Sequence, residues 1–166
     1  EIEALQSFFA LIISRYLKWM SIVNCHRIKR NHSAKTLQFS FKTYRPGQRE
    51  MAVRVYHAIR SKKNIVIQAP TGIGKTMSAL FSGIKAIGEG KTEKIYYLSA
   101  RNTGHLQVEN MLKKLGKSGF DYTYVRLSAR ERLCPKTEQD CIPDNCQYAN
   151  GYYDRLLPAL NDTFKN

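Results

Sequence analysis

The chain has 166 residues, 43% of them hydrophobic, and its 27 Lys and Arg outnumber 13 Asp and Glu to give a net charge of +14. This length predicts one domain with a sizeable core, and the apolar content argues against intrinsic disorder. The most apolar stretch is much shorter than the roughly 20 residues of a membrane-spanning helix, and no signal peptide is visible. The positive charge indicates an anionic partner, with nucleic acid as the first candidate.

The charge is distributed unevenly along the chain. Residues 1–49 carry nine basic and two acidic side chains, and residues 50–133 carry fifteen and six. Residues 134–166 carry three basic and five acidic side chains, and they hold three of the four cysteines. The last segment is therefore expected to be a different module. Because the chain begins at Glu1 rather than Met, we also expect a fragment or a processed chain.

Helices are predicted where apolar residues recur every three to four positions. The first such segment covers residues 4–24, and the basic, polar residues 25–43 that follow it are predicted to be a connector. A turn is expected at Pro46-Gly47. Three further helices are predicted, the first following the turn to about Arg60 and the others over residues 75–87 and 104–115.

Three short apolar or alternating runs predict strands, at residues 64–69, 94–99 and 121–127. Their alternation with helices places the chain in the α/β class, with a parallel sheet covered by helices. Three strands are few for such a sheet, so the chain is expected to end before the fold is complete.

A phosphate-binding loop is expected between the first strand and the next helix, in the sequence Ala69-Pro70-Thr71-Gly72-Ile73-Gly74-Lys75-Thr76. The glycines allow the backbone to approach a phosphate closely, and the helix N-terminus adds partial positive charge. Lys75 is expected to reach the β- and γ-phosphates, and Thr76 to hold Mg²⁺ through its hydroxyl. Ala69 replaces the first glycine of the strict motif, but the pattern still predicts binding of a nucleoside triphosphate.

The loop resembles motif I of superfamily 2 helicases, and Tyr44-Arg45-Pro46-Gly47-Gln48 resembles the segment that positions adenine in those enzymes. The resemblance implies that Arg45 and Gln48 bind the nucleotide. The side-chain amide of Gln48 suits this role because it can both donate and accept hydrogen bonds at the adenine edge. A surface residue that caps a helix is the alternative for Gln48. The segment after the second strand resembles motif Ia, which implies that Ser99, Arg101 and Thr103 contact the backbone of single-stranded DNA. A solvated loop is the alternative there.

Three cysteines, Cys134, Cys141 and Cys146, have the spacing C-x6-C-x4-C. The nucleotide motif favours a reducing cytoplasm, where clustered cysteines bind metal more often than they form disulfides. Zinc and an iron–sulfur cluster both take four ligands. The residues around these cysteines resemble the cluster region of XPD/DinG-like helicases, with the closest likeness to a bacterial DinG-like branch. The resemblance implies a [4Fe–4S] cluster with a fourth ligand outside this chain, because Cys25 is a poor substitute.

The resemblance covers about residues 44–166 and implies a domain organisation. Residues 1–43 would be an N-terminal helix and basic connector, residues 44–130 the first part of a RecA-like domain, and residues 131–166 a truncated, mostly irregular or helical cluster segment.

The function implied by the resemblance is that of an ATP-dependent DNA helicase of 5′-to-3′ polarity in repair or replication. It would act on single-stranded DNA and duplex junctions, away from any membrane. No DEAH box and no second RecA-like domain are found in the sequence, so the chain alone is expected to lack full activity. Two alternatives remain: a P-loop ATPase with structural zinc that binds RNA or a protein, and a non-catalytic nucleic-acid-binding module.

Overall fold

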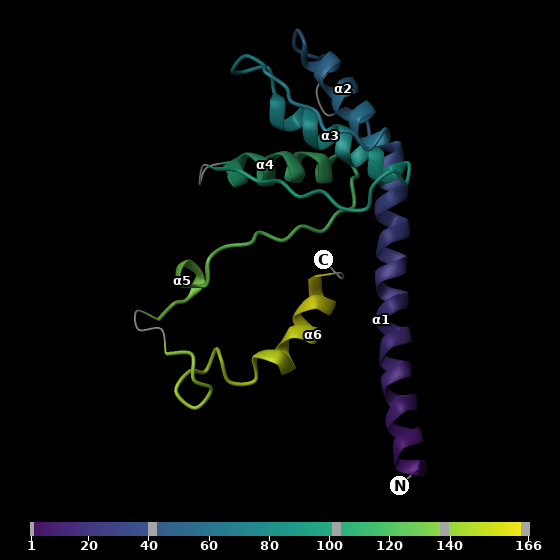
Figure 1. The fold of residues 1–166 in the computed structure, drawn as a ribbon, viewed down its shortest axis with the longest axis vertical. Helices are drawn as coiled ribbons and strands as arrows, with labels where there is room; N and C mark the ends of the chain where they lie inside the picture. The colour runs from purple at the N-terminus through teal and green to yellow at the C-terminus, as the bar shows by residue number, and fades with distance from the viewer. Residues whose placement is uncertain (1, 40–42, 101–103, 137–139, 164–166) are drawn as a thin grey trace. The chain divides into compact units, whose positions relative to one another are not determined.

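The computed structural model describes residues 2–39, 43–100, 104–136 and 140–163. Six helices form in these residues (Figure 1): α1 (Ile2–Thr36), α2 (Gln48–Arg60), α3 (Lys75–Gly88), α4 (Gly104–Lys117), α5 (Arg130–Leu133) and α6 (Tyr152–Thr163). The chain divides into two compact units. One comprises Asn24–Tyr122, and the other combines Glu1–Val23 with Thr123–Asn166.

Helix α1 confirms the predicted N-terminal helix but continues twelve residues beyond residue 24, to Thr36. The predicted connector over 25–43 is therefore wrong as far as Thr36. The sequence contains no Gly or Pro before Pro46 to stop the helix, and its hydroxyl side chains bond within it. Ser33 Oγ donates to the Arg30 carbonyl at 3.0 Å, and Thr36 Oγ1 donates to the His32 carbonyl at 3.2 Å.

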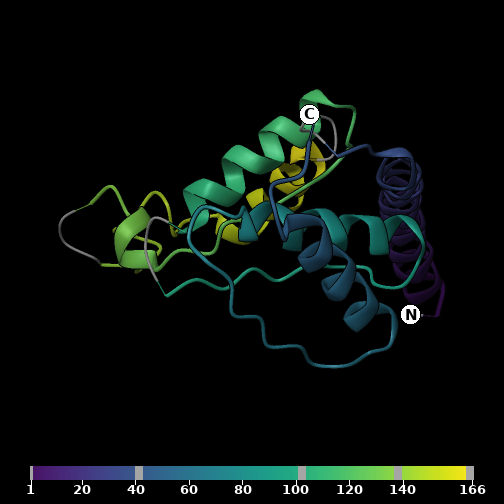
Figure 2. The same ribbon diagram turned by 90° about the horizontal axis from the view of Figure 1, so that it is seen from above.

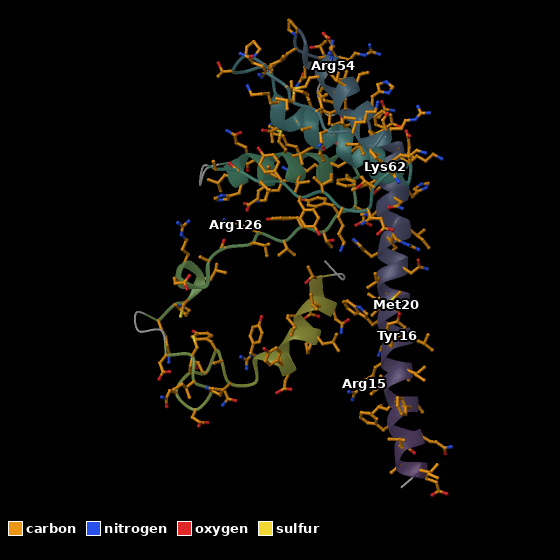
Figure 3. The ribbon with its side chains drawn as sticks, in the orientation of Figure 1. Arg15, Tyr16, Met20, Arg54, Lys62 and Arg126 are labelled. Atoms are coloured by element: carbon orange, nitrogen blue, oxygen red, sulfur yellow. The ribbon has the colours of Figure 1, made fainter. Side chains whose placement is uncertain are left out.

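The N-terminal part of α1 carries large apolar side chains that are exposed. Tyr16 and Met20, labelled in Figure 3, are 58% and 42% exposed. Despite its 35 residues, neither α1 nor any other helix in the described part of the chain is long and apolar enough to cross a membrane.

Helices α2, α3 and α4 confirm the three predicted helices. Within the Asn24–Tyr122 unit, α2 packs against α3 and α3 packs against α4 (Figure 2). The predicted inner face of α3 is largely buried, with Met77 and Ile84 each 1% exposed. The core of this unit gathers residues from α1, α3, α4 and the segments that follow α1 and α4: Ala34, Leu37, Met77, Ile84, Ile87, Leu115 and Phe120.

The end of α1 is fastened to the end of α3. A Cβ added to Gly88 would lie 2.8 Å from the Ala34 carbonyl carbon, so only glycine permits this approach of the two backbones. Lys85 Nζ donates to the Lys35 carbonyl at 2.5 Å, which satisfies one of the unpaired carbonyls at the C-terminus of α1.

The three predicted strands are wrong for the described residues, which contain no β-strand. The runs 64–69, 94–99 and 121–127 are irregular, and their apolar side chains largely face solvent: Val66 is 98% exposed, Leu98 90% and Leu127 90%. Helical hydrogen bonds close within the segment, whereas a strand exists only when a neighbouring strand pairs with it. The composition of the three runs therefore could not guarantee strands.

Candidate nucleotide-binding site

The phosphate loop leads directly into the N-terminus of α3. Gly72 and Gly74 have φ angles of 84° and 89°, the left-handed region that glycine adopts without steric cost. Helix α3 begins at Lys75 and has no acidic residue in its first turn. The unpaired N–H groups and the positive end of the helix dipole therefore face the loop without a competing carboxylate from that turn.

Lys75 is held over the loop by backbone carbonyls. Its Nζ donates to the carbonyls of Ala69 at 3.0 Å and Pro70 at 2.7 Å. A phosphate offers the ammonium stronger, charge-assisted hydrogen bonds than a neutral carbonyl does, so an anionic ligand can draw Lys75 away from both. Thr76, the next residue of α3, is half-buried.

Gln48 is the first residue of α2 and is only 3% exposed. It closes a turn with Arg45 by two hydrogen bonds of 3.0 Å: the Gln48 N–H donates to the Arg45 carbonyl, and the Arg45 N–H donates to Gln48 Oε1. The surface-turn alternative for Gln48 is therefore wrong, because its side chain is buried.

The structure brings this turn against the phosphate loop at three points. The Arg45 guanidinium donates to the Gly72 carbonyl, and a Cβ on Gly47 would lie 3.0 Å from Ile73 Cδ1. A Cβ on Gly74 would overlap the side-chain amide of Gln48. Two segments separated by more than 20 residues thus form one site, with Gln48 directly beside the last loop glycine.

Gly74→Ala is expected to cost more stability than Gly72→Ala. Both residues have positive φ, so either alanine adds about 1–2 kcal/mol of backbone strain. Nothing lies within 4 Å of a Cβ on Gly72, whereas the Gly74 Cβ meets Gln48, and such overpacking costs about 1–3 kcal/mol more. Urea unfolding of both variants measures the difference. Equal losses of stability would contradict the close contact between Gly74 and Gln48.

Only one of the three predicted DNA-contacting residues lies in the described part of the chain. Ser99 is exposed, and a Cβ on Gly104 at the start of α4 would overlap its hydroxyl. Arg101 and Thr103 lie outside the described residues.

The three predicted metal ligands differ in exposure: Cys134 is half-buried, Cys141 exposed and Cys146 4% exposed. The pKa of the Cys146 thiol is lowered, chiefly because the backbone N–H of Ala149 donates to it and also because that of Tyr148 does. Among the described residues, however, no three His, Cys, Asp or Glu side chains are grouped so as to hold a metal ion. The structure thus does not assemble the predicted cysteine site.

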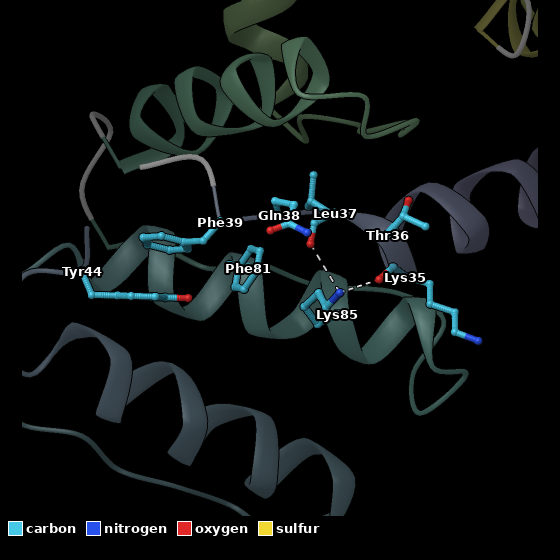
Figure 4. A pocket seen from close by; sticks show the side chains of 8 residues that line it. All are labelled: Lys35, Thr36, Leu37, Gln38, Phe39, Tyr44, Phe81 and Lys85. Atoms are coloured by element: carbon cyan, nitrogen blue, oxygen red, sulfur yellow. Dashed lines mark hydrogen bonds between the residues drawn. The ribbon is translucent and has the colours of Figure 1, made fainter. Parts of the chain in front are cut away.

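An open cavity of about 830 Å³ lies beside α3 (Figure 4), and none of the residues that line it belongs to the phosphate loop. Phe39 stacks on Tyr44 with ring centroids 4.0 Å apart and meets Phe81 edge-on at 5.2 Å. The rest of its wall is formed by Lys35, Thr36, Leu37, Gln38 and Lys85. Of the predicted site segments that the structure describes, only Tyr44–Gln48 contributes a residue to the wall of this cavity, and that residue is Tyr44.

Sequence reasoning missed two buried serines on α3, Ser78 and Ser82, which are 0% and 3% exposed. Both donate hydrogen bonds to carbonyls of α2. The available signal was their position, four residues apart on the same side of a helix whose inner face is otherwise apolar.

Comparison with known proteins gives one family and two relatives. The profile of the DEAD/DEAH box helicases matches residues 45–164. A protein described as a probable ATP-dependent helicase of Methanocaldococcus jannaschii is 34% identical over 47 residues, which cover 28% of this chain and 7% of that protein. A regulator of telomere elongation helicase 1 homolog of Aedes aegypti is 29% identical over 135 residues, which cover 76% of this chain and 13% of that protein.

The chain thus spans only a small part of the length of these two relatives. No solved structure matches the chain significantly. The family match covers most of the sequence and contains the phosphate loop, the adjoining turn except Tyr44, and the three cysteines of the C-x6-C-x4-C segment. The chain therefore belongs to the DEAD/DEAH box helicase family, which implies a RecA-like fold and the use of ATP with Mg²⁺.

Proposed function

We propose that this chain is the nucleotide-binding part of an ATP-dependent DNA helicase. The observation that carries the proposal is the junction between the turn at Arg45–Gln48 and the phosphate loop, where Arg45 bonds the Gly72 carbonyl and Gln48 lies against Gly74. This arrangement puts a base-reading amide beside a phosphate-binding helix N-terminus.

Each site residue then has a chemical role. The loop residues Pro70, Thr71, Gly72, Ile73 and Gly74 surround the phosphates with backbone N–H groups where the residue has one. Lys75 neutralises the β- and γ-phosphates, and Thr76 holds Mg²⁺. Gln48 Oε1 already accepts the Arg45 N–H, which leaves one lone pair and both amide hydrogens for the adenine edge.

Single-stranded DNA is the proposed polymer, bound through a basic surface that includes Ser99, Arg101 and Thr103. Residues 1–133 carry 24 of the 27 Lys and Arg. This excess of positive charge supports contacts with the DNA backbone that have little sequence preference. Movement in the 5′-to-3′ direction, a role in repair or replication and a cytoplasmic location belong to the same proposal.

Binding to labelled oligonucleotides tests the choice of polymer. Fluorescence anisotropy is expected to show tighter binding to single-stranded DNA than to RNA of the same sequence. For about three phosphate contacts, the logarithm of the binding constant should fall with a slope of about −2 against the logarithm of salt concentration. Preference for RNA, or affinity independent of salt, would contradict the proposal and favour an RNA- or protein-binding ATPase.

Hydrolysis is expected to be slow in the 166-residue chain. In-line attack on the γ-phosphate needs an oriented water and stabilisation of the transition-state charge. In the described part of the chain, the hydrogen bonds and close approaches found at the loop come from Arg45, Gln48 and Ser78, none of which is an acid that could orient a water. Steady-state ATPase assays measure this, and a rate like that of intact helicases would contradict it.

The XPD/DinG-like branch, with a [4Fe–4S] cluster on Cys134, Cys141 and Cys146, is a further part of the proposal. Its support is the sequence resemblance, together with the lowered pKa of the Cys146 thiol that backbone N–H donation from Ala149 produces. The proposed divisions are the N-terminal helix and connector over 1–43, the RecA-like part over 44–130 and the cluster segment over 131–166.

The 166-residue chain is expected to hold iron poorly. A four-iron cluster takes four thiolates, and the cysteine segment supplies three that the structure does not gather. Anaerobic reconstitution followed by iron and sulfide analysis measures the occupancy. A stable, stoichiometric four-iron cluster would contradict the expectation of poor retention. Bound zinc without iron would favour the structural-zinc ATPase instead.

A further inference from the structure

The contact between α2 and α3 contains hydrogen bonds repeated along both helices. Ser78 Oγ donates to the Gln48 carbonyl at 3.3 Å, and Ser82 Oγ donates to the Ala52 carbonyl at 2.6 Å. Further along, Tyr56 donates its hydroxyl to the Glu89 carboxylate. The residues on α2 are therefore one helical turn apart, and the two serines repeat that spacing on α3.

This pattern determines how far one helix can slide along the other. Apolar contacts are non-directional, whereas hydrogen bonds require particular distances and angles. Because Ala52, Ser78 and Ser82 are small and at most 7% exposed, the two backbones approach closely enough for the serines to reach carbonyls. A shift of α2 along α3 would break both serine bonds together, so these bonds specify the register of the two helices.

The first of these serines also contacts the nucleotide site. The Ser78 hydroxyl shares its single hydrogen between the Gln48 carbonyl at 3.3 Å and the Gly74 carbonyl at 3.2 Å, so one hydroxyl lies between both residues. The Gln48 amide in turn lies against Gly74. Gln48, Gly74 and Ser78 therefore form a closed set of contacts between the start of α2 and the start of α3.

We propose that Ser78 is a positioning residue that holds Gln48 in place beside the phosphate loop and thereby determines selectivity for adenine. The inference rests on the proposed adenine contact of Gln48. Ser82 makes the same kind of bond one turn further from the loop, where its hydroxyl donates to the Ala52 carbonyl and not to Gln48 or Gly74. Loss of Ser82 should therefore affect stability more than base selectivity.

The test compares Ser78→Ala with Ser82→Ala in the 166-residue chain. Calorimetry measures affinity for ATP, GTP and tripolyphosphate, each with Mg²⁺, because tripolyphosphate engages the phosphate loop without a base. Thermal unfolding measures stability. Ser118→Ala is the control for loss of an exposed serine hydroxyl, since Ser118 Oγ donates to the Lys114 carbonyl at the end of α4.

We expect Ser78→Ala to weaken ATP binding about fivefold, the value of one hydrogen bond, and to leave tripolyphosphate binding unchanged. Its preference for ATP over GTP should shrink. Ser82→Ala should lower the unfolding temperature about as much as Ser78→Ala does, but it should retain the affinity for ATP. Ser118→Ala should change neither the unfolding temperature nor the affinity. Ser78→Cys keeps the size of the side chain and a weak donor, so its ATP affinity should lie between those of the unaltered chain and Ser78→Ala. This variant replaces Ser78→Ala in the test if the alanine variant does not fold.

Equal loss of ATP affinity in the Ser78→Ala and Ser82→Ala variants would overturn the positioning role, as would equal loss of ATP and tripolyphosphate affinity in Ser78→Ala. Failure of the underlying assignment is visible in the unaltered chain. If that chain bound tripolyphosphate but did not prefer ATP to GTP, the adenine contact of Gln48 would be wrong. If it bound neither, the phosphate-loop assignment itself would be wrong.

Discussion

Replacing Lys75 with alanine is expected to weaken binding of Mg²⁺-ATP about 100-fold. The ammonium group bonds only neutral carbonyls, those of Ala69 and Pro70, among the contacts the structure describes for it, and phosphate is a stronger partner. Two charge-assisted hydrogen bonds of about 1.5 kcal/mol each account for this factor. Calorimetric titration of ATP into the variant and the unaltered chain measures the loss.

Lys113→Ala is the matched control for the Lys75 variant. Lys113 is an exposed residue of α4, and its replacement removes the same charge from the chain. We expect its ATP affinity to stay within about twofold of the unaltered chain, because salt screens the interactions of a solvent-exposed charge. A similar loss of ATP affinity in the Lys75→Ala and Lys113→Ala variants would mean that Lys75 acts through the net charge of the chain and not through a contact with phosphate.

Replacing Ile84 with alanine is expected to destabilise the chain by about 2–5 kcal/mol. Ile84 is 1% exposed on the inner face of α3, in the core that α3 shares with the end of α1 and with α4. The substitution removes buried methyl groups and leaves a cavity that the surrounding side chains fill only in part. Urea unfolding followed by circular dichroism measures the loss of free energy.

Val66→Ala is the comparison that distinguishes the observed core from the core expected on sequence grounds. Val66 lies in the middle of the first predicted strand, but its side chain is 98% exposed. We therefore expect a change within about 0.5 kcal/mol, as is usual for surface positions. A loss as large as that of Ile84→Ala would show that the run 64–69 is buried in solution.

Helices could be predicted from this sequence because their information is local. The apolar spacing in α3 directs Met77 and Ile84 to one side, and both are buried as that spacing predicts. The error in α1 was also local: Asn- and Ser-rich composition indicated a connector, but no Gly or Pro interrupts the helix before Thr36. Composition without a helix-breaking residue was insufficient evidence for a boundary.

Strands and the arrangement of the site depend on contacts between distant segments. Val66, Leu98 and Leu127 lie in runs with strand-like composition, yet each run needs a partner strand that the described residues do not provide. The phosphate loop and Gln48 were recognisable from short motifs. Their junction was not, because it depends on how α2 packs on α3 and therefore on Ser78 and Ser82, which no motif identifies.

The central claim is that the turn at Arg45–Gln48 and the loop ending at Thr76 form one ATP site. A crystal structure of the chain with Mg²⁺ and a non-hydrolysable ATP analogue tests it most directly. We predict that Lys75 Nζ leaves the carbonyls of Ala69 and Pro70 for the phosphates, and that the Gln48 amide contacts the adenine edge. A nucleotide bound elsewhere, with Lys75 still bonded to both carbonyls, would contradict the claim.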